Sequence, residues 1–177
     1  MEKIYVYADF DFLGQTEKIG ILSYERVRGN DHFSFEYSPE WLKKHGGILL
    51  SGDVMNVRGM QHPRGGNSVF GFVEDSFPDR WGRLLLDRRE RLAAQEEQRP
   101  IRSLSNYDYL VGIEDLTRMG GIRYSTEENG TFINEDSEYS VPPLESLRAL
   151  CDACEELESA EERNEFIYQA LSMLADK

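Results

Sequence analysis

The chain has 177 residues, which is long enough to bury a core of its own as one domain or two small ones packed together. Hydrophobic residues make up 40% of the sequence and aromatic residues 11%, so the composition indicates a globular protein rather than a disordered one. The net charge of −13 argues against uniform attraction to a nucleic-acid backbone.

The N-terminal part of the chain carries the pattern of an antiparallel sheet. Two runs of strand-forming residues, Ile4–Tyr7 and Ile19–Tyr24, flank a turn-prone segment and predict a hairpin. The turn residues Arg28–Asp31 precede His32–Tyr37, in which aromatic residues alternate and so share one face of a strand. We therefore predict a three-stranded antiparallel sheet with an aromatic face. The aromatic residues are Phe33, Phe35 and Tyr37.

A short helix and a loop follow this predicted sheet. Ser38 is a good capping residue and Pro39 suits the first helical position, which predicts a short helix ended by Gly46 and Gly47. The segment 51–67 is rich in glycine and proline and predicts a loop over the sheet.

The clearest helix is predicted from Pro78 to Gln95. Pro78 suits its first turn, Asp75 or Ser76 can cap it, and apolar residues recur with helical spacing. Its polar face belongs to a basic segment. The arginines of that segment are Arg80, Arg83, Arg88, Arg89, Arg91, Arg99 and Arg102.

The rest of the chain predicts a helix, a strand and two further helices. The helix starts at Ser103 or Ser105 and closes at Gly112, and the strand covers Gly120–Tyr124. Two amphipathic runs after Pro142-Pro143 predict an acidic helical hairpin. The predicted fold is thus α+β, an antiparallel sheet with packed helices, with domains over residues 1–141 and 142–177.

Cysteine usage and hydropathy exclude further classes. Cys151 and Cys154 are too few for a disulfide framework and lack the second ligand pair of a zinc site, so we interpret them as small helical residues. No apolar run approaches the roughly 20 residues that span a bilayer, and no secretory signal core is present. We expect a cytoplasmic protein that does not bind membranes.

Residues suited to catalysis are scattered. Neither Gly65–Ser68 nor Gly120-Gly121 forms a phosphate-cradling turn followed by lysine, and we interpret both as turns. Asp75 and Asp79 could act as paired carboxylates, but helix capping is the interpretation we favour. The three histidines are not grouped. They are His32, His45 and His62.

The basic helix leaves two interpretations open. Its arginines are either a solvated face that also pairs with the acidic C-terminal helices, or an interface with an anionic protein or nucleic acid. We name Arg83, Arg88 and Arg91 as candidate partner-binding residues. Phe77 and Trp81 are expected to pack as core anchors.

The segment Phe70–Leu86 resembles the N-terminal region of HipA-type serine/threonine kinases, toxins of a bacterial toxin–antitoxin system. In that family an aromatic pair precedes a Phe-Pro-Asp-like element and a basic helix. A Tyr-Leu-Val-Gly-like turn follows, as in Ser105–Ile113, and then a small-residue strand, as in Arg118–Tyr124. The resemblance covers roughly residues 1 to 125. Its motif residues here are Phe77, Pro78, Asp79 and Trp81.

The resemblance implies a non-catalytic region that packs on a kinase core, supplied in cis or in trans, and helps present it to a HipB-like helix-turn-helix antitoxin. DNA would then be contacted only through the antitoxin. A full-length kinase would use ATP and Mg²⁺ to phosphorylate a protein serine or threonine. The family's phosphate-binding and catalytic residues come later in its sequence, so no catalytic, cofactor or metal residue is assigned here.

Three alternatives follow for this chain. It is the N-terminal part of a longer kinase, or a separately encoded partner or inhibitor of a split kinase, or a nucleic-acid binding module that uses the basic helix. A small stand-alone enzyme would need a site around Asp75, Asp79 and His62.

Overall fold

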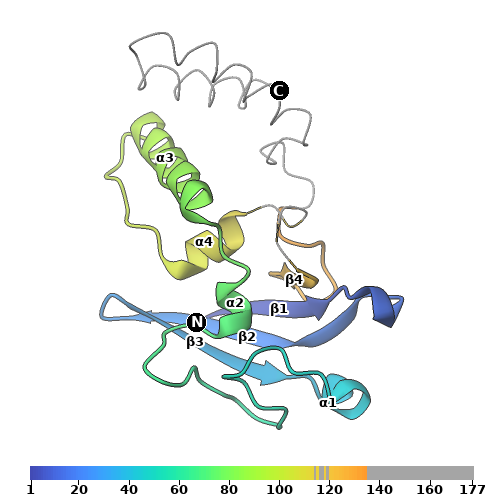
Figure 1. Ribbon diagram of the computed structural model, residues 1–177. Coiled ribbons are helices and arrows are strands. Elements are labelled where there is room, and N and C mark those ends of the chain that lie inside the picture. The colour runs from blue at the N-terminus through green and yellow to red at the C-terminus, as the bar shows by residue number, and fades with distance from the viewer. Residues whose placement is uncertain (114, 116–117, 119, 135–177) are drawn as a thin grey trace. The chain divides into compact units, whose positions relative to one another are not determined.

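The computed structural model describes residues 1–113, 115, 118 and 120–134. The chain divides into two units, Met1–Glu135 and Asp136–Lys177, and the description below concerns the first (Figure 1). The predicted C-terminal hairpin, the boundary between residues 141 and 142, and both cysteines lie outside the described residues.

The described part is built on one four-stranded antiparallel sheet. Its strands are β1 (Glu2–Ala8), β2 (Glu17–Val27), β3 (Asn30–Tyr37) and β4 (Ile122–Ser125), in the spatial order β3-β2-β1-β4. The predicted α+β class and the first three strands are confirmed. The strand expected over 120–124 forms as β4, and it adds a fourth strand to the predicted three by pairing with β1.

Local turn chemistry explains the meander of the first three strands. Arg28 and Gly29 connect β2 to β3 with φ angles of 52° and 84°, the left-handed pair that a two-residue hairpin turn requires. The turn between β1 and β2 contains the short 3₁₀ helix η1 (Asp11–Leu13) and ends at Gly14, whose φ is 69°. Both turns join strands that are adjacent in sequence and in the sheet.

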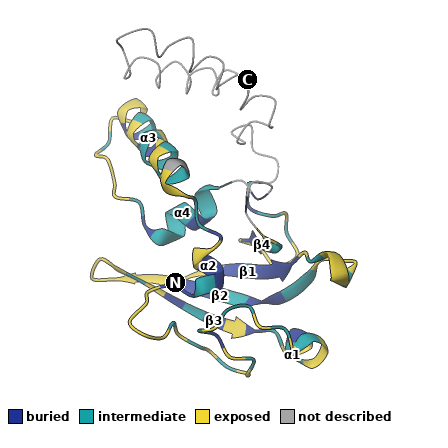
Figure 2. Cartoon of the chain, in the orientation of Figure 1, coloured by how far each residue is buried: buried dark blue, intermediate teal, exposed yellow. Residues whose placement is uncertain are grey.

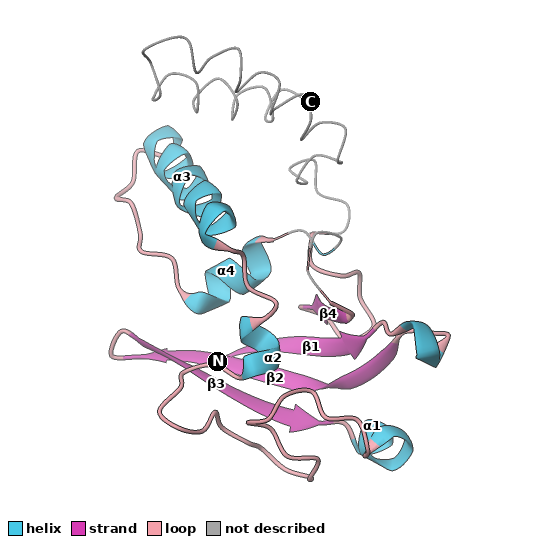
Figure 3. Cartoon of the chain, viewed as in Figure 1, coloured by secondary structure: helices cyan, strands magenta, loops and turns pink. Residues whose placement is uncertain are grey.

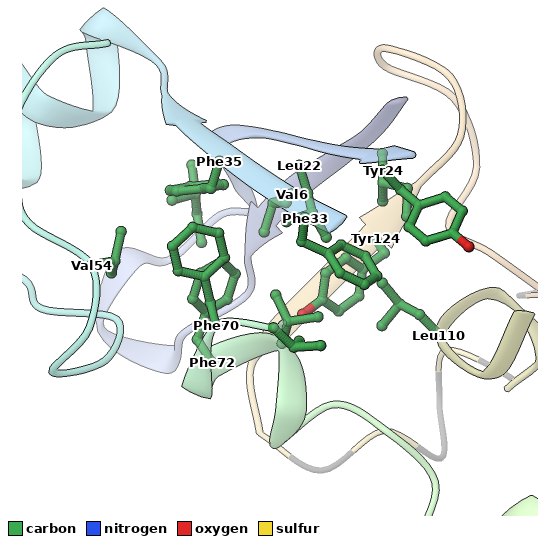
Figure 4. Packing of buried hydrophobic residues seen from close by; sticks show 14 of the residues in the cluster. Val6, Leu22, Tyr24, Phe33, Phe35, Val54, Phe70, Phe72, Leu110 and Tyr124 are labelled. Carbon is green, nitrogen blue, oxygen red and sulfur yellow. The ribbon is translucent and has the colours of Figure 1, made fainter. Parts of the chain in front are cut away.

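The core lies on the aromatic face of the sheet. Phe33, Phe35 and Tyr37 are all buried there, as their alternation predicts. Figure 4 shows Phe35 against Phe70 and Phe72, while Phe33 lies toward Leu110. Burial of such large aromatic side chains is the main driving force for this fold.

Helices follow and separate the strands of the described part (Figure 3). They are α1 (Pro39–His45), α2 (Gly71–Glu74), α3 (Arg80–Glu96) and α4 (Asn106–Gly112). The prediction of α1 is confirmed, because the Ser38 side chain accepts a hydrogen bond from the Trp41 backbone N–H at 3.0 Å. Of the two starts considered for α4, Ser105 is correct: it forms a capping box with Asp108.

The loop between α1 and α2 covers the edge of β3. Gln61 and Phe35 exchange both backbone hydrogen bonds, at 2.8 and 2.9 Å, so the predicted loop shields part of the edge strand. The Gln61 side chain also holds the backbone N–H and C=O of Met55. The segment is therefore irregular in shape but well supplied with hydrogen bonds.

Candidate functional site

Helix α2, which the sequence did not predict, fixes the start of the Phe70–Leu86 motif. The Asp53 carboxylate accepts a hydrogen bond from the Gly71 backbone N–H at 3.0 Å. The rings of Phe70 and Phe72 lie 6.1 and 5.1 Å from that of Phe35, so the aromatic pair of the motif is inserted into the core. The motif thereby connects the sheet to the helices that follow.

A buried polar cluster holds the chain as it leaves α2. The Tyr124 hydroxyl donates to Ser76 Oγ at 2.8 Å, and Ser76 Oγ donates to the carbonyl of Phe72 at 3.1 Å. Arg118, with its side chain only 1% exposed, donates to the carbonyls of Ser76 and Leu110. Burial raises the pKa of Tyr124 to about 12, so its hydroxyl stays protonated and keeps donating. The cluster connects α2, α4 and β4.

Asp115 supplies the negative charge that compensates Arg118, and it also pairs with Arg123. Asp115 is buried, forms an ion pair with Arg118 at 3.7 Å, and accepts a hydrogen bond from Arg123. Arg123 also binds Asp9 at 2.8 Å. Removing one residue of this chain of ion pairs would leave a buried charge without its partner, so we interpret the chain as structural.

The first turn of α3 differs from the prediction. Neither Asp75 nor Ser76 caps this helix: Asp79 does, by accepting a hydrogen bond from the Gly82 backbone N–H at 2.8 Å. Pro78 therefore lies before the helix rather than in its first turn. Its ring packs so closely on Gly82 that an added Cβ atom would lie 2.7 Å from Pro78 Cβ. The capping interpretation of Asp79 is confirmed, and Asp75 belongs to the end of α2 instead.

Arg83 is held between two aromatic rings. Its guanidinium carbon lies 5.4 Å from the ring centre of Phe77 and 4.9 Å from that of Tyr109, and its Nε donates to the Pro78 carbonyl at 3.3 Å. Such stacking fixes both the side chain and the angle between helix and linker. Phe77 is half-buried against the core, whereas the side chain of Trp81 lies outside the described part.

One stripe of α3 faces α4 and the connection to it. This inner stripe consists of Arg83, Asp87, Glu90 and Ala94, which recur at helical spacing. Asp87 accepts a hydrogen bond from the Tyr109 hydroxyl at 2.8 Å. Ala94 is buried, and α3 contacts α4 along this side. The inner stripe therefore fixes α3 to the rest of the fold.

Glu90 binds two arginines of the basic segment. Both Glu90 oxygens accept hydrogen bonds from the Arg99 guanidinium, and Arg102 donates to them from its backbone N–H and Nε at 3.1 and 3.2 Å. The hydrogen bonds from Arg99 are the main cause that lowers the pKa of Glu90 from 4.5 to about 2. Arg99 and Arg102 are thus engaged within the domain.

A second stripe of α3, about a quarter turn around the helix from the inner stripe, has no such partners in the described part. This outer stripe consists of Arg80, Leu84, Arg88 and Arg91, again at helical spacing. Within the described residues, none of its three arginine side chains takes part in an ion pair or a hydrogen bond. Figure 2 shows exposed and half-buried residues alternating along α3, with Leu84 37% exposed. The structure therefore divides the candidates Arg83, Arg88 and Arg91 between two stripes of the helix.

The histidines occupy separate places. His45 lies against the Trp41 ring and 3.3 Å from a Glu17 oxygen, whereas His32 and His62 are exposed. Among the described residues, no three histidine, cysteine or acidic side chains come together as a possible metal site. The described helices include none that is long and apolar enough to cross a membrane.

Sequence reasoning missed the roles of Arg118, Asp115 and Glu90. Asp115 and Arg118 pair with each other at a spacing of three residues, which is a local signal, but their other partners lie on distant segments. Glu90 binds Arg99 and Arg102, and neither spacing is that of a helical pair. The capping role of Asp79 had a better signal, namely the spacing of three residues to Gly82, whose backbone N–H donates to the Asp79 carboxylate.

In the comparison with known families, the model of the HipA N-terminal domain matches residues 11–107. The matched segment runs from the first turn to the start of α4 and includes the whole of α3. No curated protein and no solved structure matches the chain.

Proposed function

This chain belongs to the family of HipA N-terminal domains, and we propose that it is a docking and regulatory domain of a HipA-like serine/threonine protein kinase. In this proposal it packs on the kinase core and contributes to association with a HipB-like antitoxin. The full-length kinase transfers phosphate from ATP, with Mg²⁺, to a protein serine or threonine. The chain itself contributes no catalytic residue.

One observation carries the docking role. The outer stripe of α3 presents three arginines that have no partner among the described residues, on a helix that the inner stripe fixes firmly. A rigid element whose charges are unpaired within the described part is suited to bind a protein surface, because little side-chain and backbone order must be imposed on binding. The family match covers this same helix.

The same features also fit a second form of the proposal. A separately encoded domain of this kind would bind a short kinase in trans and serve as its partner or inhibitor. Sequencing the gene beyond Lys177 distinguishes the two forms. Continuation of the reading frame into a lysine-containing, glycine-rich segment supports the kinase in cis.

The proposal is tested by mixing the purified chain with the HipA-type kinase core encoded in the same genome. We expect a one-to-one complex in size-exclusion chromatography with light scattering. We also expect no heat of Mg-ATP binding by the chain alone in titration calorimetry. Binding or hydrolysis of ATP by the isolated chain would contradict the non-catalytic role, and absence of any complex would contradict docking.

A further inference from the structure

We propose that the outer stripe of α3 is the surface that docks the domain, and that its occupant is an acidic, amphipathic surface of the kinase core. The inference rests on the proposed function and adds to it the docking residues and the chemistry of the partner surface. Of the predicted partner-binding residues it retains Arg88 and Arg91. It replaces Arg83, which stacks between Phe77 and Tyr109, with Arg80.

All the charges on the stripe are basic. The segment from Arg80 to Leu92 contains two acidic residues, Asp87 and Glu90, and both are engaged on the inner stripe, with Tyr109 in one case and with arginines in the other. No carboxylate therefore neutralises the outer stripe from its own helix. Carboxylates of a partner would find three guanidinium groups, the side chains that bind carboxylates most specifically.

The length of the stripe matches a helix or an extended segment. Arg80 and Arg91 are separated by 11 residues, which corresponds to roughly 16 Å along a helix at about 1.5 Å per residue. Three cations over this distance can engage carboxylates on three successive turns of a partner helix. A single small anion would use one of them.

Leu84 favours a protein over a nucleic acid. It lies between Arg80 and Arg88 on the stripe and is 37% exposed, so the surface offers apolar area among its charges. Residues 1–134 carry seventeen basic and twenty-one acidic side chains, so no basic surplus surrounds the stripe. A phosphate backbone would be repelled outside the stripe, whereas an amphipathic protein surface would match both its charge and its leucine.

The inner stripe makes the outer one a preorganised surface. The Asp79 cap, the stacked Arg83 and the hydrogen bonds of Glu90 hold α3 along its length. Partner binding would then order only the tips of three arginine side chains. Arginine keeps much of its hydrogen-bonding geometry in a planar group, which limits this cost.

The experiment is a charge reversal with a matched control. Titration calorimetry measures binding of the kinase core to the wild-type chain, to Arg88→Glu/Arg91→Glu, and to Arg58→Glu. Arg58 is an exposed arginine on the loop between α1 and α2 and makes no ion pair in the described part. We expect the double variant to bind at least tenfold more weakly and the control to bind within twofold of wild type.

Two further measurements exclude a folding defect. Arg88→Lys/Arg91→Lys should recover most of the affinity, and the thermal unfolding midpoints of all variants should agree. Raising the salt from 50 to 300 mM should weaken wild-type binding more than binding by the double reversal. The reason is that salt screens the attraction of the two arginines for the partner, and the double reversal no longer has this attraction.

The outcomes separate the two proposals. If the core binds the wild-type chain and the double reversal equally, docking stands but this surface is wrong. If the core binds neither, the proposed function itself fails. Competition by a synthetic peptide of residues 136–177, or binding of duplex DNA that the double reversal abolishes, would assign the outer stripe to another occupant and overturn the inference.

Discussion

At the scale of single residues, Gly20 shows how closely the strands approach. It lies within β2, opposite Tyr37 on β3. A Cβ atom at this position would lie 2.9 Å from the Phe35 ring and closer still to the carbonyl oxygen of Glu36. The backbone oxygen cannot rotate away, so an added methyl group must displace β3.

We therefore predict that Gly20→Ala lowers the free energy of unfolding by about 1–3 kcal/mol, the usual cost of forcing an extra carbon into a packed core. Urea denaturation followed by tryptophan fluorescence measures this change. Gly47→Ala is the matched control, because nothing lies within 4 Å of its added Cβ atom. Equal stability of the two variants would contradict the close approach.

Glu90 should make stability depend on pH. Its folded-state pKa, about 2, lies below the ordinary value of 4.5, so its contribution is complete above pH 4.5 and disappears as the pH falls toward 2. We predict that Glu90→Gln reduces the acid-induced loss of stability over this window. Denaturation midpoints between pH 5 and pH 2 measure it, and an unchanged slope for the variant would count against the Arg99–Glu90–Arg102 arrangement.

At the scale of elements, the cap decides where α3 begins. Asp79 satisfies the backbone N–H of Gly82, one of the four groups that a helix start leaves without an intrahelical partner. Both aspartates before α3 are capping residue types, so local chemistry left the boundary ambiguous. The packing of Pro78 on Gly82 places the boundary after the proline.

The cap predicts a specific effect of substitution. Asp79→Ala should lower stability by about 1 kcal/mol, because the Gly82 N–H loses its acceptor, and should speed hydrogen exchange in the first turn of α3. Asp75→Ala is the control: its side chain is exposed and makes no hydrogen bond in the described part. If the two variants exchange at the same rate, Asp79 is not the cap.

In the sheet, too, the pairing of some strands follows from the local sequence, whereas the pairing of β4 depends on distant segments. The hairpins of β1, β2 and β3 follow from alternation and from turn residues such as Gly29. The position of β4 does not, because four residues at Ile122–Ser125 carry too little pattern to specify a neighbour. Pairing with β1 also depends on the buried hydrogen bond from Tyr124 to Ser76, which follows α2.

At the scale of the whole molecule, charge is distributed very unevenly. Residues 1–134 carry seventeen basic and twenty-one acidic side chains, and residues 135–177 carry three and twelve. The net charge of −13 therefore says little about any one surface of the described part. A basic stripe on α3 is compatible with an acidic chain, because screening limits charge interactions to about 8–10 Å at ordinary salt.

The sequence alone determined the class of fold, the first three strands, the existence of α1, α3 and α4, and the family. These features depend on neighbours in the chain: alternation, helical spacing, caps and turns all act within a few residues. The family motif is local too, since its aromatic pair, Phe-Pro-Asp element and basic helix are consecutive.

Only the tertiary structure decided how the arginines are used. The sequence presents seven arginines as one basic segment, yet Arg83 stacks on Tyr109, Arg99 and Arg102 bind Glu90, and the arginines of the outer stripe have no partner among the residues that the structure describes. The physical reason is that the charge of a side chain is fixed by its chemistry, whereas its partner depends on which distant segments packing brings within hydrogen-bonding distance.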